Sequence, residues 1–220
     1  MPRRRPVSPP STLAEWLAYL ETLHPKSIAL GLERVSEVAA RLDAAPACPV
    51  VTVAGTNGKG STSSLLEHML RADGYRVALY TSPHLLRYNE RVRIDGVPAG
   101  DEELCAAFAR VDAARQEISL TYFEFGTLAA LDIFSRAGLD ILVLEVGMGG
   151  RLDAVNAVDA QVAVVTTVDI DHVAWLGSDR ETIAGEKAGI FRAGRPAIYG
   201  DTNIPAAVVA RALALGAPLY

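Results

Sequence analysis

The sequence predicts an α/β protein with a mostly parallel sheet of the P-loop type and helices on both faces. Three observations lead to this prediction. Apolar runs rich in Val, Ile and Leu alternate along the chain with segments of helical periodicity, which is typical of parallel sheets. A glycine-rich turn joins the first of these runs to a helical segment. Half of the 220 residues are apolar, which is enough for one packed domain.

Two helices are expected before the first strand. Apolar residues recur at helical spacing from Leu13 to Leu20 behind Ser11, which is a good N-cap. The β-branched run of residues 50–54 predicts the first strand. The other elements of this half are predicted at residues 32–42 (helix), 61–73 (helix, stopped by Gly74) and 76–80 (strand).

The second half continues the alternation of strands and helices. Asp95-Gly96 suits a hairpin turn, Asp101 is expected to cap a helix, and Thr121 with Glu124 forms a capping box for the next one. Helices are predicted at residues 101–118, 121–138, 179–191 and 206–215, and strands at 141–146, 161–168 and 196–199. Residues 216–220 look like the entry to another strand, so we expect a truncated chain.

Composition excludes several classes of protein. The net charge of −5 argues against a sequence-independent nucleic-acid binder. Cys48 and Cys105 do not have metal-ligand spacing and indicate a reducing compartment. The apolar runs are too short to cross a membrane, and residues 1–6 lack the apolar stretch of a signal peptide. We therefore expect a cytoplasmic protein with a flexible basic tail at residues 1–10.

The strongest functional motif is the turn at residues 55–61, which reads Gly-Thr-Asn-Gly-Lys-Gly-Ser. Backbone amides and a lysine ammonium at a strand–helix junction are suited to bind phosphate oxygens. The strict Walker pattern fails, because Val53 occupies the position of its first glycine. A flexible turn without function is the alternative. We predict ATP binding by Asn57, Gly58, Lys59, Gly60 and Ser61.

Further polar residues follow the predicted strands. Glu145 interrupts a run that otherwise suits a sheet interior, so we expect it to pair with a cation or to bind Mg²⁺. His172 closes the 169–172 segment after the fourth strand and reads either as a structural histidine or as a ligand. Ser82 lies at the start of the loop after the second strand. Its hydroxyl is placed there to act as a metal ligand or to contact phosphate, and an ordinary turn without function is the alternative. The glycines at 147–150 do not continue into a dinucleotide-binding fingerprint, because Leu152 replaces its third glycine.

Five stretches together resemble the folylpolyglutamate synthase/dihydrofolate synthase family of the Mur ligase superfamily. They span nearly the whole chain in the expected order, and the Gly-Lys-Gly-Ser form favours the folate branch over the cell-wall branch. These stretches are residues 27–35, 55–61, 80–85, 144–153 and 171–190 with its Glu-Lys-Ala-Gly-Ile end.

The resemblance implies roles that the residues alone do not. It implies that Ser82, Glu145 and His172 hold Mg²⁺ and that Lys187 is the family lysine carbamylated by carbon dioxide and acts with Lys59 in catalysis. From the residues alone, Lys187 would be an exposed helix residue. The substrate-facing residues that it implies are Ser27, Ile28, Ala29, Leu30, Phe123, Arg151, Leu152 and Asp153.

The implied reaction joins L-glutamate to dihydropteroate, to folates or to both, through an acyl phosphate made with ATP. The family has a C-terminal ligase domain that residues 11–220, expected to be the ATP-binding domain, do not supply, so we expect this fragment alone to be inactive. A monomer without nucleic-acid or membrane partners is expected. The rival interpretations are another Mur-type amino-acid ligase, a non-catalytic nucleotide-binding fragment and, with the weakest support, a small GTPase.

Overall fold

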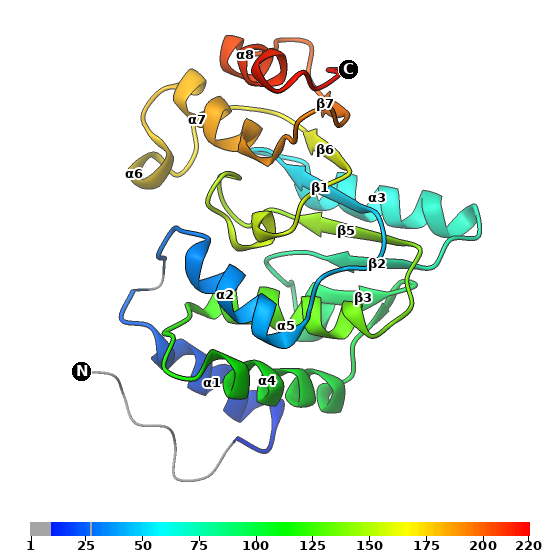
Figure 1. Cartoon of the computed structure of the whole chain (residues 1–220), viewed down its shortest axis with the longest axis vertical. Helices are drawn as coiled ribbons and strands as arrows, with labels where there is room; N and C mark the ends of the chain where they lie inside the picture. Colours follow the sequence, from blue (N-terminus) through cyan, green and yellow to red (C-terminus); the bar gives the residue numbers. More distant parts are fainter. Residues whose placement is uncertain (1–9, 27) are drawn as a thin grey trace.

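The structure is a computed structural model that describes residues 10–26 and 28–220. Over these residues, seven strands form one sheet in the order β4-β3-β2-β5-β1-β6-β7 (Figure 1). The pairs β2–β5, β5–β1, β1–β6 and β6–β7 are parallel, whereas β3 pairs antiparallel with both β2 and β4. The predicted mostly parallel sheet is therefore confirmed. The strands are β1 Val50–Ala54, β2 Val77–Tyr80, β3 Val92–Ile94, β4 Val97–Pro98, β5 Ile141–Glu145, β6 Val162–Val165 and β7 Ala197–Tyr199.

Helices cover both faces of the sheet, but unequally. On one face, the strand side chains Val53, Leu79 and Val143 pack with Leu66 and Leu70 of α3 in a small apolar cluster. On the other face, the remaining long helices share one large core with the sheet (Figure 1). The helices are α1 Leu13–Leu23, α2 Glu33–Leu42, α3 Lys59–Ala72, α4 Asp101–Arg115, α5 Tyr122–Ser135, α6 Val173–Leu176, α7 Arg180–Lys187 and α8 Ala206–Leu215, with 3-10 turns η1 Tyr88–Arg91, η2 Ala154–Ala157 and η3 Ala188–Ile190.

Several predicted boundaries were wrong by a few residues. The N-cap of α1 is Thr12 rather than Ser11, because Thr12 and Glu15 form a reciprocal capping box. Asp101 is the first residue of α4 and not its cap, which is Gly100. The same helix ends at Arg115, before a residue with a φ of +51°, instead of reaching Ile118. The fourth predicted strand is shorter than expected, and α3 begins two residues before Ser61.

Other local predictions are confirmed. Thr121 and Glu124 form the expected capping box at α5. Asp95 and Gly96 turn the β3–β4 hairpin with φ values of +51° and +77°, the conformation that tight hairpins favour. Helix α8 has the predicted bounds. After α8, Leu219 makes a parallel bridge to Ala197 of β7, so the residues after that helix pair with the sheet edge. The predicted basic tail lies outside the described residues, except Pro10.

The parallel arrangement positions the functional residues. Strands β1, β2, β5 and β6 run in one direction, so the loops that follow them emerge together at the carboxyl ends of the strands. We call this side of the sheet its carboxyl edge. Ligands of open α/β sheets bind at this carboxyl edge. Among the described residues, the helices are all too short or too polar to cross a membrane.

Candidate active site

The glycine-rich turn after β1 is held against the end of β6. Gly55 has a φ of +151°, and a Cβ there would lie 1.9 Å from Oγ1 of Thr166, so only glycine fits. The Thr166 hydroxyl donates to the carbonyl of Asn57 at 2.6 Å, and the Thr56 amide donates to the carbonyl of Thr167 at 2.8 Å. These contacts give the turn one fixed shape.

Lys59 starts α3, and its ammonium lies back over the turn. Its Nζ donates to the carbonyls of Gly55 at 3.0 Å and Thr56 at 3.3 Å. Because the first amides of a helix have no acceptor within the helix, those of Lys59, Gly60 and Ser61 are oriented to bind an anion together with the helix dipole. The Asn57 amide donates to Oγ1 of Thr167 at 3.2 Å, and ATP binding by Asn57 stays a prediction.

Glu145, at the end of β5, lies beside this turn. Its side chain is almost fully buried, and its carboxylate oxygens are 3.6 and 3.7 Å from the position of a Cβ on Gly60. The backbone amide of Ser82 donates to Oε2 at 3.1 Å. Burial raises the pKa of Glu145, while the Ser82 hydrogen bond and the Lys59 charge act in the opposite direction. The two motifs after β1 and β5 thus converge on one edge.

A divalent cation suits this carboxylate. In the part of the chain that the structure describes, no basic side chain forms an ion pair with Glu145, and an unpaired buried carboxylate is unfavourable unless something neutralises it. The same residues contain no cluster of three His, Cys, Asp or Glu side chains spaced to hold a metal ion. Mg²⁺ commonly binds through one or two carboxylates, with phosphate oxygens and water as its other ligands, so Glu145 fits that mode.

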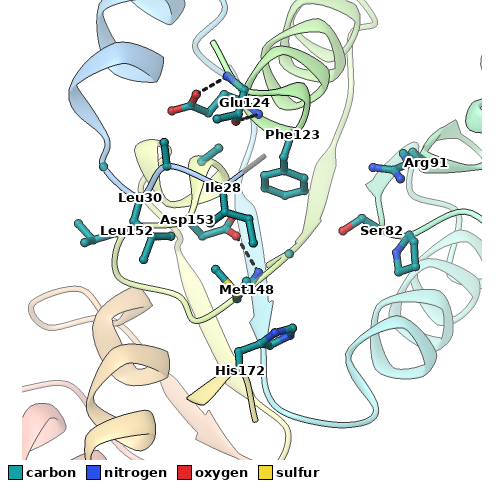
Figure 2. A pocket seen from close by; sticks show the side chains of 16 residues that line it. Ile28, Leu30, Ser82, Arg91, Phe123, Glu124, Met148, Leu152, Asp153 and His172 are labelled. Carbon is teal, nitrogen blue, oxygen red and sulfur yellow. Dashed lines mark hydrogen bonds between the residues drawn. The ribbon is translucent and has the colours of Figure 1, made fainter. Parts of the chain in front are cut away.

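The other predicted metal ligands lie near, but they do not all touch Glu145. Ser82 contacts it through its amide, and its side chain lines the cavity described below. His172 lines the same cavity, with a half-exposed side chain and Nε2 3.5 Å from Oδ2 of Asp171. Its backbone is left-handed, with a φ of +48°. In Figure 2 the His172 ring lies at the bottom of the cavity, below Met148, whereas Ser82 lies at its right-hand side.

Lys187 is buried, so the prediction from the residues alone of an exposed lysine was wrong. It is the last residue of α7, with 1% of its surface exposed. The pKa of Lys187 is lowered to about 8, mainly by burial and also by the nearby charge of Lys59, while Asp171 opposes both effects. An amine with this pKa is partly neutral near pH 8 and can then act as a nucleophile. The burial of Lys187 could not be predicted, because the helix pattern does not show what packs against the end of the helix.

The loop after β5 explains the burial of Lys187. A Cβ on Gly150 would lie 2.8 Å from the carbonyl oxygens of Glu186 and Lys187. A Cβ on Gly147 would lie 2.6 Å from the ring of Phe123. The glycines therefore allow the loop to pack directly on α7 on one side and on Phe123 on the other. The run of glycines in the sequence therefore reflects close backbone packing rather than dinucleotide binding.

A cavity of about 290 Å³ opens beside this edge. Figure 2 shows that its walls come from the segment before α2, the start of α5, the loop after β5 and the loop after β2. Most of the predicted substrate-facing residues line it together with Ser82 and His172, namely Ile28, Ala29, Leu30, Phe123, Leu152 and Asp153. Ser27 lies outside the described residues. The cavity is thus mostly apolar, with polar groups at specific points.

Asp153 is the buried acid of this cavity. Its Oδ2 accepts from the Met148 amide at 2.9 Å, and its Oδ1 accepts from the Val155 amide at 3.0 Å. Burial raises its pKa to about 6, although these hydrogen bonds and the Lys59 charge lower it. A carboxyl group in this environment can accept from a ring N–H of a ligand.

Arg151 does not line the cavity. It forms an ion pair with Glu186 of α7, with Nη2 to Oε1 at 2.8 Å. This pair connects the loop after β5 to the helix that carries Lys187. The sequence could not indicate the direction of Arg151, because it depends on α7, 35 residues further along the chain.

Two arginines at the cavity were missed. Arg34 of α2 donates to Glu124 at 2.7 Å and to the carbonyl of Ala29 at 2.7 Å, so it ties the segment before α2 to the start of α5. Arg91, at the end of η1, lines the cavity. Arg34 lies in one of the stretches that carry the family resemblance, and this was the only signal for it.

Comparison with known proteins agrees with this geometry. The Mur ligase middle domain family matches residues 53–211. The chain is 57% identical to a dihydrofolate synthase/folylpolyglutamate synthase of Escherichia coli strain K12, over 95% of this chain and 50% of that protein.

Solved structures give the same result. One described as E. coli FolC in complex with DHPP and ADP superposes with a TM-score of 0.93 at 57% identity, covering 95% of this chain and 51% of the other. A bifunctional folylpolyglutamate synthase/dihydrofolate synthase with Mn, AMPPNP and L-glutamate bound gives 0.91 at 54% identity, covering 97% and 53%. The chain therefore spans about half the length of the relatives that it matches.

Proposed function

The chain belongs to the Mur ligase middle-domain family, within its folylpolyglutamate synthase/dihydrofolate synthase branch, and we propose that it is the ATP-binding part of an amide ligase. The proposed ligase joins L-glutamate to dihydropteroate, to folates or to both. The single observation that carries the proposal is the convergence of the Lys59 turn, the Glu145 carboxylate and the Ser82 end of the cavity on one edge of the sheet. This arrangement supports a phosphate site next to a site for an apolar acid.

The reaction proposed for this edge has two steps. A substrate carboxylate oxygen attacks the γ-phosphorus of ATP, giving an acyl phosphate and ADP. The glutamate amine then attacks the acyl carbon, loses a proton and expels phosphate. Lys59 and the first amides of α3 would stabilise charge on the transferred phosphoryl group. Glu145, with Ser82 and His172, would hold Mg²⁺, which supplies further charge neutralisation when bound.

Lys187 is proposed to carry a carbamate, as the family resemblance implies. Its neutral amine would attack the carbon of CO₂ and release one proton, leaving a carboxylate on the side chain. The lowered pKa favours the neutral amine that this step needs. A carbamate would also replace the repulsion between the buried Lys187 ammonium and the half-buried Lys59 ammonium with attraction.

The cavity is proposed to hold the heterocyclic end of the acid. Phe123 presents an aromatic ring against which a planar heterocycle can stack. Asp153 would accept from its ring N–H groups, while Ile28 and Leu30 would cover its apolar surface. The carboxylate of the acid would then point toward Ser82, which Figure 2 shows at the right-hand side of the cavity.

The proposal is tested with the protein encoded by the complete reading frame that contains this chain. With Mg·ATP, dihydropteroate and L-glutamate, we expect ADP release and a product whose mass equals the two substrates minus one water. Tetrahydrofolate in place of dihydropteroate tests chain extension, and a UDP-linked cell-wall precursor tests the rival ligase class. Absence of ADP release with both dihydropteroate and tetrahydrofolate would overturn the proposal.

The half-length coverage supports a second possibility, that this chain alone binds nucleotide without ligation. Calorimetry of residues 1–220 with a non-hydrolysable ATP analogue would then show binding, while no amide forms even when the other half is supplied. We also propose that the protein is cytoplasmic, which the two free cysteines support, and that it is a monomer. Light scattering of the purified protein tests the oligomeric state.

A further inference from the structure

We propose that Arg91 holds the carboxylate of the acid substrate at the phosphate end of the cavity. This inference rests on the proposed function, because it assigns the residue that receives the group to be phosphorylated. None of the candidate residues derived from the sequence has this role. A carboxylate in a mostly apolar cavity needs a cation to bind it, and a bidentate guanidinium is the strongest such partner among side chains.

The backbone places Arg91 beside the phosphate site. Its carbonyl accepts from the amide of Thr81 at 3.0 Å. The backbone amide of Ser82, the residue after Thr81, donates to Glu145. Glu145 in turn lies against Gly60 of the phosphate turn. Figure 2 shows the Arg91 guanidinium at the same end of the cavity as Ser82, on the side facing Phe123. Arg91 thus lies at the Ser82 end of the cavity, the end that Glu145 connects to the phosphate turn.

Three side chains fix the guanidinium. Its Cζ lies 5.3 Å from the centroid of the Tyr88 ring and 5.7 Å from that of Tyr122. Its Nε donates to Nδ1 of His84 at 2.9 Å. Tyr88 is buried, and Tyr122 and His84 are partly buried. The two tyrosine rings contact the guanidinium plane, and His84 accepts from Nε. The two terminal nitrogens are left for a ligand, and these are the nitrogens that bind a carboxylate in a bidentate pair.

The other charged groups at the cavity are already engaged. Glu124 pairs with Arg34, and both oxygens of Asp153 accept from backbone amides. Over residues 10–26 and 28–220, Arg91 forms no ion pair with a carboxylate. A cation held in an aromatic frame without an acidic partner, at a cavity wall, is suited to an anionic group of a ligand.

The test compares an acid with its neutral analogue. Dissociation constants of dihydropteroate and of its primary carboxamide are measured by ligand fluorescence on the complete protein and on its Arg91→Gln and Arg91→Lys variants. We expect the wild type to prefer the acid by roughly 10- to 100-fold, as for other charge-assisted pairs. Arg91→Gln should lose this preference and bind the carboxamide as well as the wild type does. Arg91→Lys should keep part of it, because it retains the charge without the bidentate geometry.

The matched control is Arg87→Gln. Arg87 is the N-cap of the same 3-10 turn, but it is exposed and pairs with the exposed Asp101. This variant should retain the full preference for the acid and the wild-type melting temperature. It therefore reports how much of any effect comes from disturbing the turn.

The outcomes separate this inference from the proposed function. If the wild type makes no amide product, the proposed function is wrong. If the wild type is active but Arg91→Gln still prefers the acid, only the role of Arg91 is wrong. Equal weakening of both ligands would show a merely structural role, and an effect confined to the KM of ATP would assign Arg91 to the nucleotide. Either result would overturn the inference.

Discussion

Two groups of buried carboxylates in this molecule have opposite surroundings. Away from the carboxyl edge of the sheet, Asp132 of α5 and Glu67 of α3 are fully buried. Each forms ion pairs with arginine: Asp132 with Arg110 and Arg136, and Glu67 with Arg93. At the carboxyl edge, the buried Glu145 and Asp153 accept only from backbone amides.

We propose that this difference separates carboxylates that stabilise the fold from carboxylates that bind a ligand. A carboxylate that only stabilises the fold is neutralised within the fold, because leaving it unpaired is unfavourable. Burial raises the pKa of both edge carboxyls, Glu145 and Asp153, so the folded protein retains an unfavourable charge there. Such a charge is typical of a site that a ligand completes. Variants that remove one carboxylate at a time should therefore divide into loss of activity and loss of stability.

The largest effect is expected for Glu145→Gln, in the ligase activity of the complete protein. The change keeps the size of the side chain and removes the charge proposed to hold Mg²⁺, so the rate should fall about 10²- to 10³-fold. The melting temperature should stay the same or rise, because the desolvation penalty of an unpaired carboxylate is removed. Steady-state ADP release and thermal unfolding measure the two effects. Wild-type activity in this variant would contradict the metal role.

Asp153→Asn should change how stability depends on pH. The pKa of Asp153 is about 6 in the folded protein, against the ordinary value of 3.8 that applies to the unfolded chain. Between these values the folded state holds a proton that the unfolded state has released, so stability falls as pH rises through this window. At about 1.4 kcal/mol per pH unit, the loss is about 3 kcal/mol above pH 6.

The readout for Asp153→Asn is the slope, because the amide also loses one acceptor for the Met148 and Val155 amides. Urea unfolding of residues 1–220 at pH 4, 5, 6 and 7 should show a difference between variant and wild type that grows toward pH 6 and then levels off. A constant difference across these pH values would show that Asp153 does not titrate in the window.

Asp132→Asn belongs to the other group, and it should reduce stability without affecting the site. The variant leaves Arg110 and Arg136 without their shared carboxylate. Both arginines are partly exposed and can be hydrated, so we expect a loss of about 1–3 kcal/mol, as for a charged hydrogen bond. The KM values for ATP and acid should not change. A fall in activity at temperatures where the variant remains folded would break the division between the two groups.

Much of this comparison could be predicted from the sequence. Glu145 was found because a single acid interrupts a run of apolar strand residues, and the phosphate turn because glycines and a lysine follow a β-branched run. The parallel topology then required both to lie at one edge. Local signals of this kind, including the capping box at Thr121 and the hairpin at Asp95-Gly96, depend only on near neighbours.

What the sequence could not predict depends on distant packing. The burial of Lys187 comes from the loop at Gly150, and the direction of Arg151 comes from Glu186. The frame that holds Arg91 joins residues from two segments, one of them beginning at Tyr122. No periodicity or spacing reports such contacts, because each is set by how elements far apart in the chain meet.

The smallest effect is expected for Arg34→Lys, which tests the boundary between the two groups. Glu124 resembles Asp132 in having an arginine partner, yet it lines the cavity. Arg34 also binds the carbonyl of Ala29, so it holds a substrate-facing segment in place. Lysine keeps the charge but cannot make the same set of hydrogen bonds. We expect the KM of the acid to rise about 3- to 10-fold, equivalent to about 1 kcal/mol, with the KM of ATP unchanged. Glu37→Gln, which removes the exposed ion pair with Arg41 on the same helix, is the control and should change neither value. Arg34→Lys could instead lower the melting temperature and leave both KM values at those of the wild type. The Arg34–Glu124 pair would then belong with the carboxylates that stabilise the fold, and Glu124 would not be part of the substrate site.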